Sequence, residues 1–197
     1  SVDLFGPRVG FVKLKSEVTD KDGDAIPGIV FLRGGSVAVL MVLKCKETGI
    51  EHCLQVRLHS VPAVLPQNMS LPAGMLDGNG DFAGAMAREI QEETGIKCER
   101  AKLIDMTSMA YGAKCEGMYP SVGGSDEFVR LFLYKETKAS EELAELEGKL
   151  AGKKQEHEKI SLCLVPLDKL WQLSSDAKAL SALLLYEKLG LSESESV

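Results

Sequence analysis

The chain has 197 residues, of which 45% are apolar and 26% are charged, with a formal net charge of −6 and a pI near 5.2. These values predict one globular domain with a full core and a small extension. No apolar run reaches the roughly 20 residues of a membrane span, and an acidic chain lacks the clustered Lys and Arg that bind a nucleic-acid backbone, so we expect neither a membrane nor a nucleic-acid partner.

The cysteines are scattered and odd in number, and no two of them form a C-x-x-C pair. They are Cys45, Cys53, Cys98, Cys115 and Cys163. This pattern argues against a disulfide framework and against a zinc site, and it predicts buried thiols in a reducing compartment. Because the chain begins at Ser1 without a methionine, we expect a trimmed N-terminus and an intracellular location, in the cytoplasm or in an organelle.

The N-terminal segment has the pattern of a β-hairpin. Apolar and polar side chains alternate over residues 10–18, residues 28–33 are apolar again, and turn-forming residues lie between the two runs. Asp20, Asp22 and Asp24 alternate as at the start of a calcium loop. However, no glutamate follows at the twelfth position and no flanking helices are predicted, so a solvated turn is the preferred interpretation.

Two strands of a central sheet are predicted next, over residues 36–44 and 52–58, because Val, Leu and other strand formers predominate there. Residues 62–70 contain two prolines and are expected to form a loop that leads to Leu71.

The following stretch predicts a glycine-rich loop over Gly74–Gly80 and then a helix over residues 81–94. The Asp81 carboxylate can accept hydrogen bonds from the free amides of the first helical turn, and Gly95 is expected to end the helix. One arc of the helix is apolar and is expected to pack on a core. This arc contains Phe82, Ala83, Met86, Ala87 and Ile90.

Acidic side chains lie beside that apolar arc. Spacings of three and four residues bring Glu89 together with Glu92 and Glu93 on neighbouring turns. Carboxylates at the edge of a core repel one another unless a cation lies among them, and oxygen ligands of this kind suit magnesium or manganese. The alternative is a solvated acidic face, which is the usual meaning of a glutamate-rich helix.

Gly74, followed fourteen residues later by Arg88-Glu89-Ile90-Gln91-Glu92-Glu93-Thr94-Gly95-Ile96, resembles the Nudix box, Gly-x5-Glu-x7-Arg-Glu-(apolar)-x-Glu-Glu-x-Gly-(apolar). One position departs, because Gly80 stands where the family has its first glutamate and Asp81 follows it. The resemblance implies the Nudix fold, an α/β/α sandwich around a mixed sheet. It also implies that Glu89, Glu92 and Glu93, with the Ala73 carbonyl, hold Mg²⁺ or Mn²⁺.

Two further elements are similar to the ADP-sugar pyrophosphatase branch of that family. Leu54-Gln55-Val56-Arg57 resembles its Glu-Gln-x-Arg strand, with Leu54 in place of the glutamate, and Arg57 is a candidate phosphate contact. Residues 101–109 are predicted as a strand and 110–125 as a long loop. The end of the loop, Tyr119-Pro-Ser-Val-Gly-Gly-Ser-Asp-Glu127, resembles the Pro-Ser-x-Gly-Gly-x-x-Glu element of the branch.

In that loop, Gly124, Ser125 and Glu127 are the predicted substrate-binding residues, because glycine lets a backbone amide approach a ligand and the polar groups can bind ribose or phosphate-linked water. The alternative for this loop is a simple turn before a strand over residues 128–135. The alternative for Arg57 is an exposed arginine at the end of its strand.

A helix over residues 140–151 and a strand over 160–165 are predicted next, with Glu156-His157-Glu158 just before the strand. In the resembling pyrophosphatases a Glu-x-Glu element at this place activates or holds the attacking water. Glu158 and Glu156 are therefore candidate general bases, and a polar loop is the alternative.

The C-terminal part is expected to contain a short helix from Pro166 with Trp171 in the core, and an amphipathic helix over residues 174–189 capped near Ser175 or Asp176. We expect an N-terminal β subdomain at residues 1–35, a Nudix hydrolase domain at 36–190 and a polar tail at 191–197.

The predicted activity is Mg²⁺-dependent hydrolysis of ADP-ribose or ADP-glucose to AMP and a sugar phosphate. The start of the chain, Asp3-Leu-Phe-Gly-Pro-Arg-Val-Gly-Phe11, resembles plant-type ADP-sugar diphosphatases, which implies a homodimer built through the N-terminal subdomain. The alternatives are hydrolysis of UDP-glucose, GDP-mannose or coenzyme A, and a non-catalytic nucleotide-sugar sensor, since Gly80 breaks the box.

Overall fold

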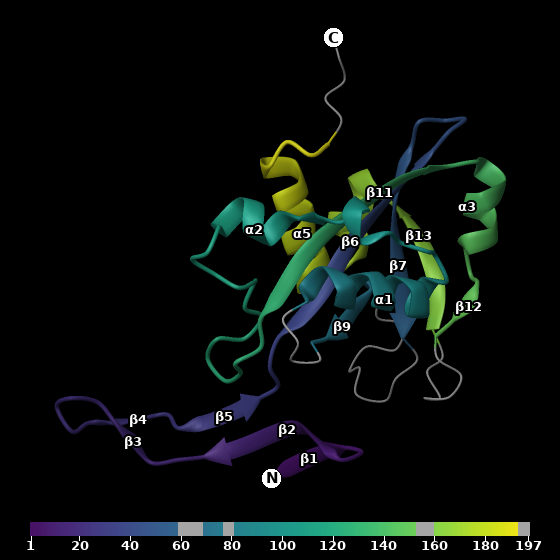
Figure 1. Ribbon diagram of the computed structural model, residues 1–197. Helices are drawn as coiled ribbons and strands as arrows, with labels where there is room; N and C mark the ends of the chain where they lie inside the picture. The colour runs from purple at the N-terminus through teal and green to yellow at the C-terminus, as the bar shows by residue number, and fades with distance from the viewer. Residues whose placement is uncertain (59–68, 77–80, 153–159, 193–197) are drawn as a thin grey trace.

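A computed structural model describes residues 1–58, 69–76, 81–152 and 160–192 of the chain (Figure 1). Within these ranges the strands form a three-stranded sheet, an eight-stranded sheet and a small separate hairpin. The described residues include no helix with the length and apolar character that a membrane crossing requires.

The N-terminal sheet is antiparallel and lies below the main body in Figure 1. Its strands are β1 (Val2–Phe5), β2 (Arg8–Lys15) and β5 (Ile29–Leu32), and the hairpin β3 (Val18–Thr19) and β4 (Ala25–Ile26) extends from it. The pairing of β2 with β5 confirms the predicted hairpin. The backbone amides of Asp22 and Asp24 each donate to Asp20 Oδ1 at 2.9 Å, so the acidic segment forms a turn that is held by its own backbone.

The main sheet is mixed, as predicted for an α/β fold. Its central strand β6 (Ser36–Cys45) runs parallel to β11 (Val129–Lys138) and antiparallel to β7 (Glu51–Leu58). The other strands are β8 (Met69–Ser70), β9 (Ala73–Met75), β10 (Ile104–Asp105), β12 (Leu150–Ala151) and β13 (Ile160–Pro166). β9 pairs with the first half of β6, with Ala73 opposite Ala38 and Gly74 opposite Val37.

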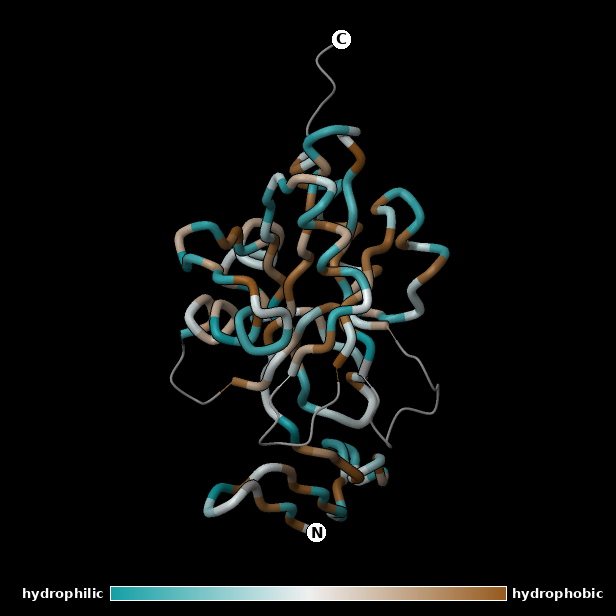
Figure 2. The backbone as a smooth tube through the Cα atoms, turned by 90° about the vertical axis from the view of Figure 1, so that its right-hand side faces the viewer, coloured by the Kyte–Doolittle hydropathy of each residue, from teal (hydrophilic) through white to brown (hydrophobic). Residues whose placement is uncertain are grey.

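Helices cover both faces of this sheet, which gives the α/β/α sandwich (Figure 1). On one face lie α1 (Phe82–Thr94) and α3 (Ser140–Leu146), and on the other lie α2 (Met106–Tyr111), α4 (Leu170–Leu173) and α5 (Ala177–Lys188), with 3₁₀ turns at Arg100–Lys102 and Leu167–Lys169. The residues of β6 alternate between two buried cores, because successive side chains of a strand point to opposite faces. Figure 2 shows hydrophobic stretches in the main sheet and also in the separate N-terminal sheet.

Several sequence predictions are wrong in detail. Residues 101–109 do not form one strand, because the Asp105 carboxylate accepts from the Ser108 amide at 2.8 Å and starts α2 there. The helix predicted to reach residue 151 ends at Leu146, since Gly148 at φ 73° turns the chain into β12.

Three side chains expected in the core lie at or near the surface. Trp171 is 61% exposed, because it projects from the short α4 and not from the face that packs on the sheet. The thiol side chains of Cys98 and Cys115 are half-buried and exposed, respectively, whereas the other three cysteines are buried.

Buried polar contacts join the start of α5 to Leu71, in the short connection between β8 and β9. Asp176 caps α5 by accepting from the Lys178 amide at 3.1 Å, and its second oxygen accepts from the Leu71 amide at 3.0 Å. Leu71 is fully buried and Asp176 is 9% exposed. Beside them, Gln55 Nε2 donates to Ser174 Oγ at 3.0 Å. The start of α5 thus fixes the backbone just before β9.

We expect Asp176→Ala to lower the free energy of unfolding by about 2–4 kcal/mol, because it removes a helix cap and leaves the buried Leu71 amide without an acceptor. Chemical denaturation monitored by circular dichroism measures this change. The exposed Asp168→Ala is the matched control and should stay within about 0.5 kcal/mol of wild type. Equal stability of the two variants would show that the cap and the Leu71 contact contribute nothing measurable.

Candidate functional site

The acidic helix α1 begins at a cap that is itself ion-paired. Asp81 Oδ1 accepts from the Gly84 amide at 3.1 Å, and a side chain at Gly84 would collide with the Asp81 carboxylate. Arg100, which follows the helix, reaches back and places Nη1 and Nη2 at 3.0 and 2.9 Å from the two oxygens of Asp81. Asp81, next to the position where the box departs from its pattern, therefore has a cationic partner in Arg100, while Gly80 itself lies outside the described residues.

The rotation of α1 about its axis is fixed by the residues that it buries. Met86 and Ile90 are fully buried in the core that also holds residues of β6 and β7, and Phe82 and Ala83 pack partly buried against it, as predicted, whereas Ala87 is not part of that core and the buried Ala85 was not predicted. Gly95 ends the helix at φ 75° with its amide donating to the Gln91 carbonyl at 3.0 Å, as predicted. These contacts leave the flank that carries Glu89 and Glu93 facing β9.

The carboxylates of Glu89 and Glu93 both meet the backbone of β9. Glu89 occupies the space that a Cβ at Gly74 would need, so any other residue there would displace the Glu89 carboxylate from the strand. Glu93 Oε2 accepts from the Ala73 amide at 3.0 Å. Both side chains are half-buried, whereas Glu92 is exposed. The structure therefore brings two of the three predicted box acids together at Ala73–Gly74.

Carboxylate oxygens beside a backbone strand are the donor set that a hard divalent cation takes. Within the ranges that the structure covers, no three His, Cys, Asp or Glu side chains gather as a metal-binding group. The two carboxylates at β9 fit a cation in charge and chemistry, and further ligands must come from the Ala73 carbonyl, from Glu92 or from water. The candidate bases Glu156 and Glu158 lie outside the described residues.

Arg57 lies on the other face of the sheet from α1. Leu54 and Val56 pack in the core beneath α1 and Cys53 packs in the core beneath α5, so alternation along β7 places Arg57 on the α5 face. Its Nε is buried and makes no hydrogen bond to any described residue. Burial raises the pKa of the neighbouring Cys163 thiol, and the positive charge of Arg57 opposes that shift. The structure does not bring Arg57 to the acid pair, and its role stays a prediction.

The loop that carries Gly124, Ser125 and Glu127 faces the N-terminal sheet. The Gly124 carbonyl accepts from the Phe31 amide at 2.8 Å, and Ser125 Oγ accepts from the Glu127 amide at 3.1 Å. The Glu127 carboxylate lies 3.2 Å from Arg33 Nε. All three residues therefore have structural partners within the chain, and their predicted contacts with substrate are untested.

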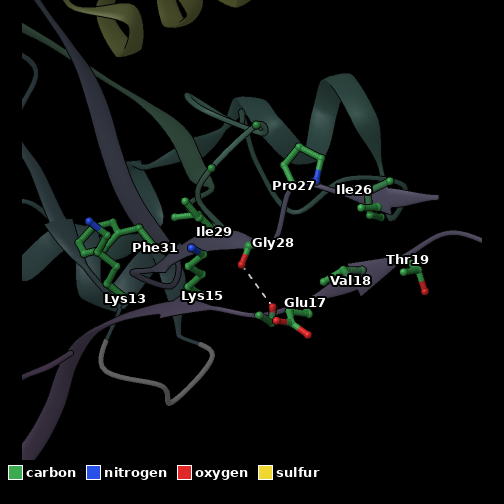
Figure 3. A pocket seen from close by; sticks show the side chains of 14 residues that line it. Lys13, Lys15, Glu17, Val18, Thr19, Ile26, Pro27, Gly28, Ile29 and Phe31 are labelled. Atoms are coloured by element: carbon green, nitrogen blue, oxygen red, sulfur yellow. Dashed lines mark hydrogen bonds between the residues drawn. The ribbon is translucent and has the colours of Figure 1, made fainter. Parts of the chain in front are cut away.

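A cavity of about 740 Å³ opens between this loop and the N-terminal strands (Figure 3). Gly123 and Gly124 line it, together with Lys13, Lys15 and Phe31 of the N-terminal sheet. Most of the remaining lining is apolar and comes from the β3–β4 hairpin and its flanks.

Sequence reasoning missed three side chains at these places, namely Arg33, Arg100 and Asp126. Asp126 Oδ1 accepts from the amides of Arg33 and Gly34 at 2.7 and 3.1 Å, across more than ninety residues of chain. Contacts between residues so far apart leave no periodic signal. The one local sign was the adjacent acids Asp126 and Glu127 directly before a strand.

Comparison with known proteins agrees with this geometry. Residues 33–184 match the sequence model of the NUDIX domain. The chain is 41% identical over 189 residues to Nudix hydrolase 14, chloroplastic, of Arabidopsis thaliana, a match that covers 94% of this chain and 60% of that protein's length. The crystal structure of a C. elegans Ap4A hydrolase binary complex superposes with a TM-score of 0.55 at 17% identity, covering 80% of this chain and 98% of that one, and supports the fold alone.

The N-cap of α1 is expected to stabilise the folded protein. We expect Asp81→Ala to lower the free energy of unfolding by about 1 kcal/mol, because the Gly84 amide loses its acceptor. Asp81→Asn keeps an acceptor at the cap and loses only an ion pair whose side chains are 38% and 66% exposed, so its cost should be within about 0.5 kcal/mol. Thermal unfolding of both variants checks this, and equal losses would mean that the ion pair and not the cap stabilises the helix.

Proposed function

Since the chain belongs to the Nudix family, whose domain spans residues 33–184, we propose that it is a Nudix hydrolase that cleaves the diphosphate of ADP-sugars. The substrates would be ADP-ribose or ADP-glucose, and the products AMP and a sugar phosphate. The observation that carries the hydrolase assignment is the meeting of Glu89 and Glu93 at the backbone of β9. The ADP-sugar class is supported by the resemblance of residues 54–57 and 119–127 to that branch.

Nudix hydrolases generally use divalent cations, and we propose that Glu89 and Glu93, with Glu92 and the Ala73 carbonyl, hold Mg²⁺ or Mn²⁺. A cation bound there would neutralise the substrate diphosphate, stabilise charge on the transferring phosphoryl group and activate water.

The protein groups have roles of their own in this proposal. Glu89 and Glu93 bring two negative charges to one half-buried place, which would repel a diphosphate unless the charge is balanced. The Ala73 amide holds Glu93 in one orientation, so less conformational freedom is lost when a ligand binds. The missing side chain at Gly74 gives Glu89 access to the strand backbone.

Other predicted residues keep the roles given by the resemblance. Arg57, Gly124 and Ser125 stay predicted substrate contacts, and Glu158 or Glu156 stays the predicted base. Glu127 was also predicted to contact the substrate, but its carboxylate already forms an ion pair with Arg33.

The rival substrates are UDP-glucose, GDP-mannose and coenzyme A, and the rival class is a sensor that binds a nucleotide sugar without turnover. The Ap4A hydrolase neighbour is only 17% identical, so it does not favour dinucleotides. A panel of these substrates assayed with Mg²⁺ separates the hydrolases, and tight ADP-ribose binding without turnover would identify a sensor. Among the expected locations we favour an organelle, since the Arabidopsis relative is named as chloroplastic.

We also propose that the chain forms a homodimer through its N-terminal sheet. By strand register, Val2, Val12, Leu14, Val30 and Leu32 share one face of that sheet. None of them is buried in the single chain, and Val2 and Leu14 are 56% and 37% exposed. An apolar sheet face of this kind is covered at low cost by the same face of a second copy.

The metal site is tested by Glu93→Gln, which keeps the shape of the side chain but removes its charge. We expect wild type to release AMP from ADP-ribose or ADP-glucose with Mg²⁺, and the variant to be slower by at least about a hundredfold. The exposed Glu145→Gln on α3 is the matched control and should match wild type. Equal rates for wild type and Glu93→Gln would rule out the proposed site.

Binding of the cation can be followed without turnover. Calorimetric titration with Mn²⁺ should show uptake by wild type and by Glu145→Gln, and strongly weakened uptake by Glu93→Gln. No uptake by wild type, with or without nucleotide, would contradict the assignment of Glu89 and Glu93 as cation ligands.

The dimer is tested by sedimentation velocity at micromolar concentration. Wild type should sediment as a dimer, and Leu14→Glu should shift it toward monomer, because a charge on the shared apolar face cannot be desolvated cheaply. Leu150→Glu, at a 78% exposed position on the far edge of the main sheet, should leave the dimer intact. A monomeric wild type would overturn the proposal.

A further inference from the structure

The connector between the N-terminal sheet and the main sheet is held by two neighbouring acids. It consists of Arg33, Gly34 and Gly35, between β5 and β6. Asp126 Oδ1 accepts from the amides of Arg33 and Gly34 at 2.7 and 3.1 Å. Next to it, the Glu127 carboxylate lies 3.2 Å from Arg33 Nε. Two residues before the connector, the Phe31 amide donates to the Gly124 carbonyl at 2.8 Å.

The ion pair between Arg33 and Glu127 is partly exposed to solvent. The side chain of Glu127 is 20% exposed and that of Arg33 is 39% exposed. Arg33 Nε is buried and forms no aligned hydrogen bond to a described residue, so it is charge that holds it near Glu127. The guanidinium also lies 5.6 Å from the ring centre of Phe11 on β2, which ties the same side chain to the N-terminal sheet.

The connector also contacts the segment after β9, the strand against which Glu89 and Glu93 lie. The Leu76 amide, directly after β9, donates to the Gly35 carbonyl at 3.1 Å. A side chain at Gly35 would collide with Phe128 and Leu76, so connector, loop end and the segment after β9 are in close contact. Phe128 in turn lies 6.4 Å, between ring centres, from Phe82, the first residue of α1.

We propose that Arg33, Asp126 and Glu127 form a latch that positions the N-terminal sheet against the segment after β9 and the start of α1, and thereby sets substrate affinity. Asp126 fixes the connector backbone and Glu127 fixes the Arg33 side chain. All three are positioning residues, and Glu127 acts through Arg33 and not on the substrate. The effect on affinity rests on the proposed ADP-sugar hydrolysis, whereas the effect on the connector does not.

The test compares Glu127→Gln, Arg33→Gln, the double variant of both, and the charge exchange Arg33→Glu with Glu127→Arg. Each single variant should raise KM for ADP-ribose by about threefold with little change in kcat, as expected for a partly exposed ion pair. The double variant should be no worse than either single one, because both remove the same interaction. The charge exchange should restore KM toward wild type. Glu116→Gln, an exposed acid in the same loop, is the matched control.

Hydrogen exchange of the Arg33 and Gly34 amides, measured without metal or substrate, gives a readout that does not need activity. Exchange should be faster in the single variants and should return toward wild type in the charge exchange. Unchanged exchange in Glu127→Gln would overturn the latch. Additive KM effects in the double variant would also overturn it, because Glu127 would then act on the substrate directly. If wild type releases no AMP from any ADP-sugar, the proposed function fails while the exchange measurement still decides the latch.

Discussion

The close approach of α1 to β9 is the constraint on which the site depends. Glu89 can lie against the strand only because residue 74 has no side chain, and Glu93 is held there by the Ala73 amide. β9 is in turn fixed by its pairing with β6, which is buried on both faces. The hydrophobic burial of Met86 and Ile90 sets the rotation of the helix and thus the direction of both carboxylates. The chemistry therefore rests on ordinary packing and on one glycine.

How much could be predicted from the sequence depended on whether the signal was local. The bounds of α1 followed from Asp81, Gly95 and a period of 3.6 residues, and the structure confirms them. Residues 106–109 were misread as the end of a strand, because a single capping aspartate, Asp105, ends the short β10 and starts α2 there. Periodicity could not place Trp171 either, since a one-turn helix has too few residues to define a face.

Some residues of the candidate site could likewise be predicted from local sequence patterns, and others could not. The pairing of Glu89 with Glu93 was predictable, because spacing along one helix fixes which side chains are neighbours. The partners of Asp81 and Glu127 were not predictable, since Arg100 and Arg33 reach them through the folding of separate segments. Arg57 was expected near phosphate from its motif, yet strand alternation places it on the face of the sheet opposite α1. The family is therefore established by local pattern, while the substrate contacts depend on tertiary structure.

The position of Trp171 has a practical consequence for spectroscopy. It is the chain's single tryptophan, and most of its surface is in contact with solvent in the folded protein. Its emission is therefore expected to resemble that of the denatured chain already, which makes intrinsic fluorescence a poor monitor of global unfolding. The same indole is well suited to reporting any molecule that docks on α4, because quenching or a blue shift there would stand out against a quiet background.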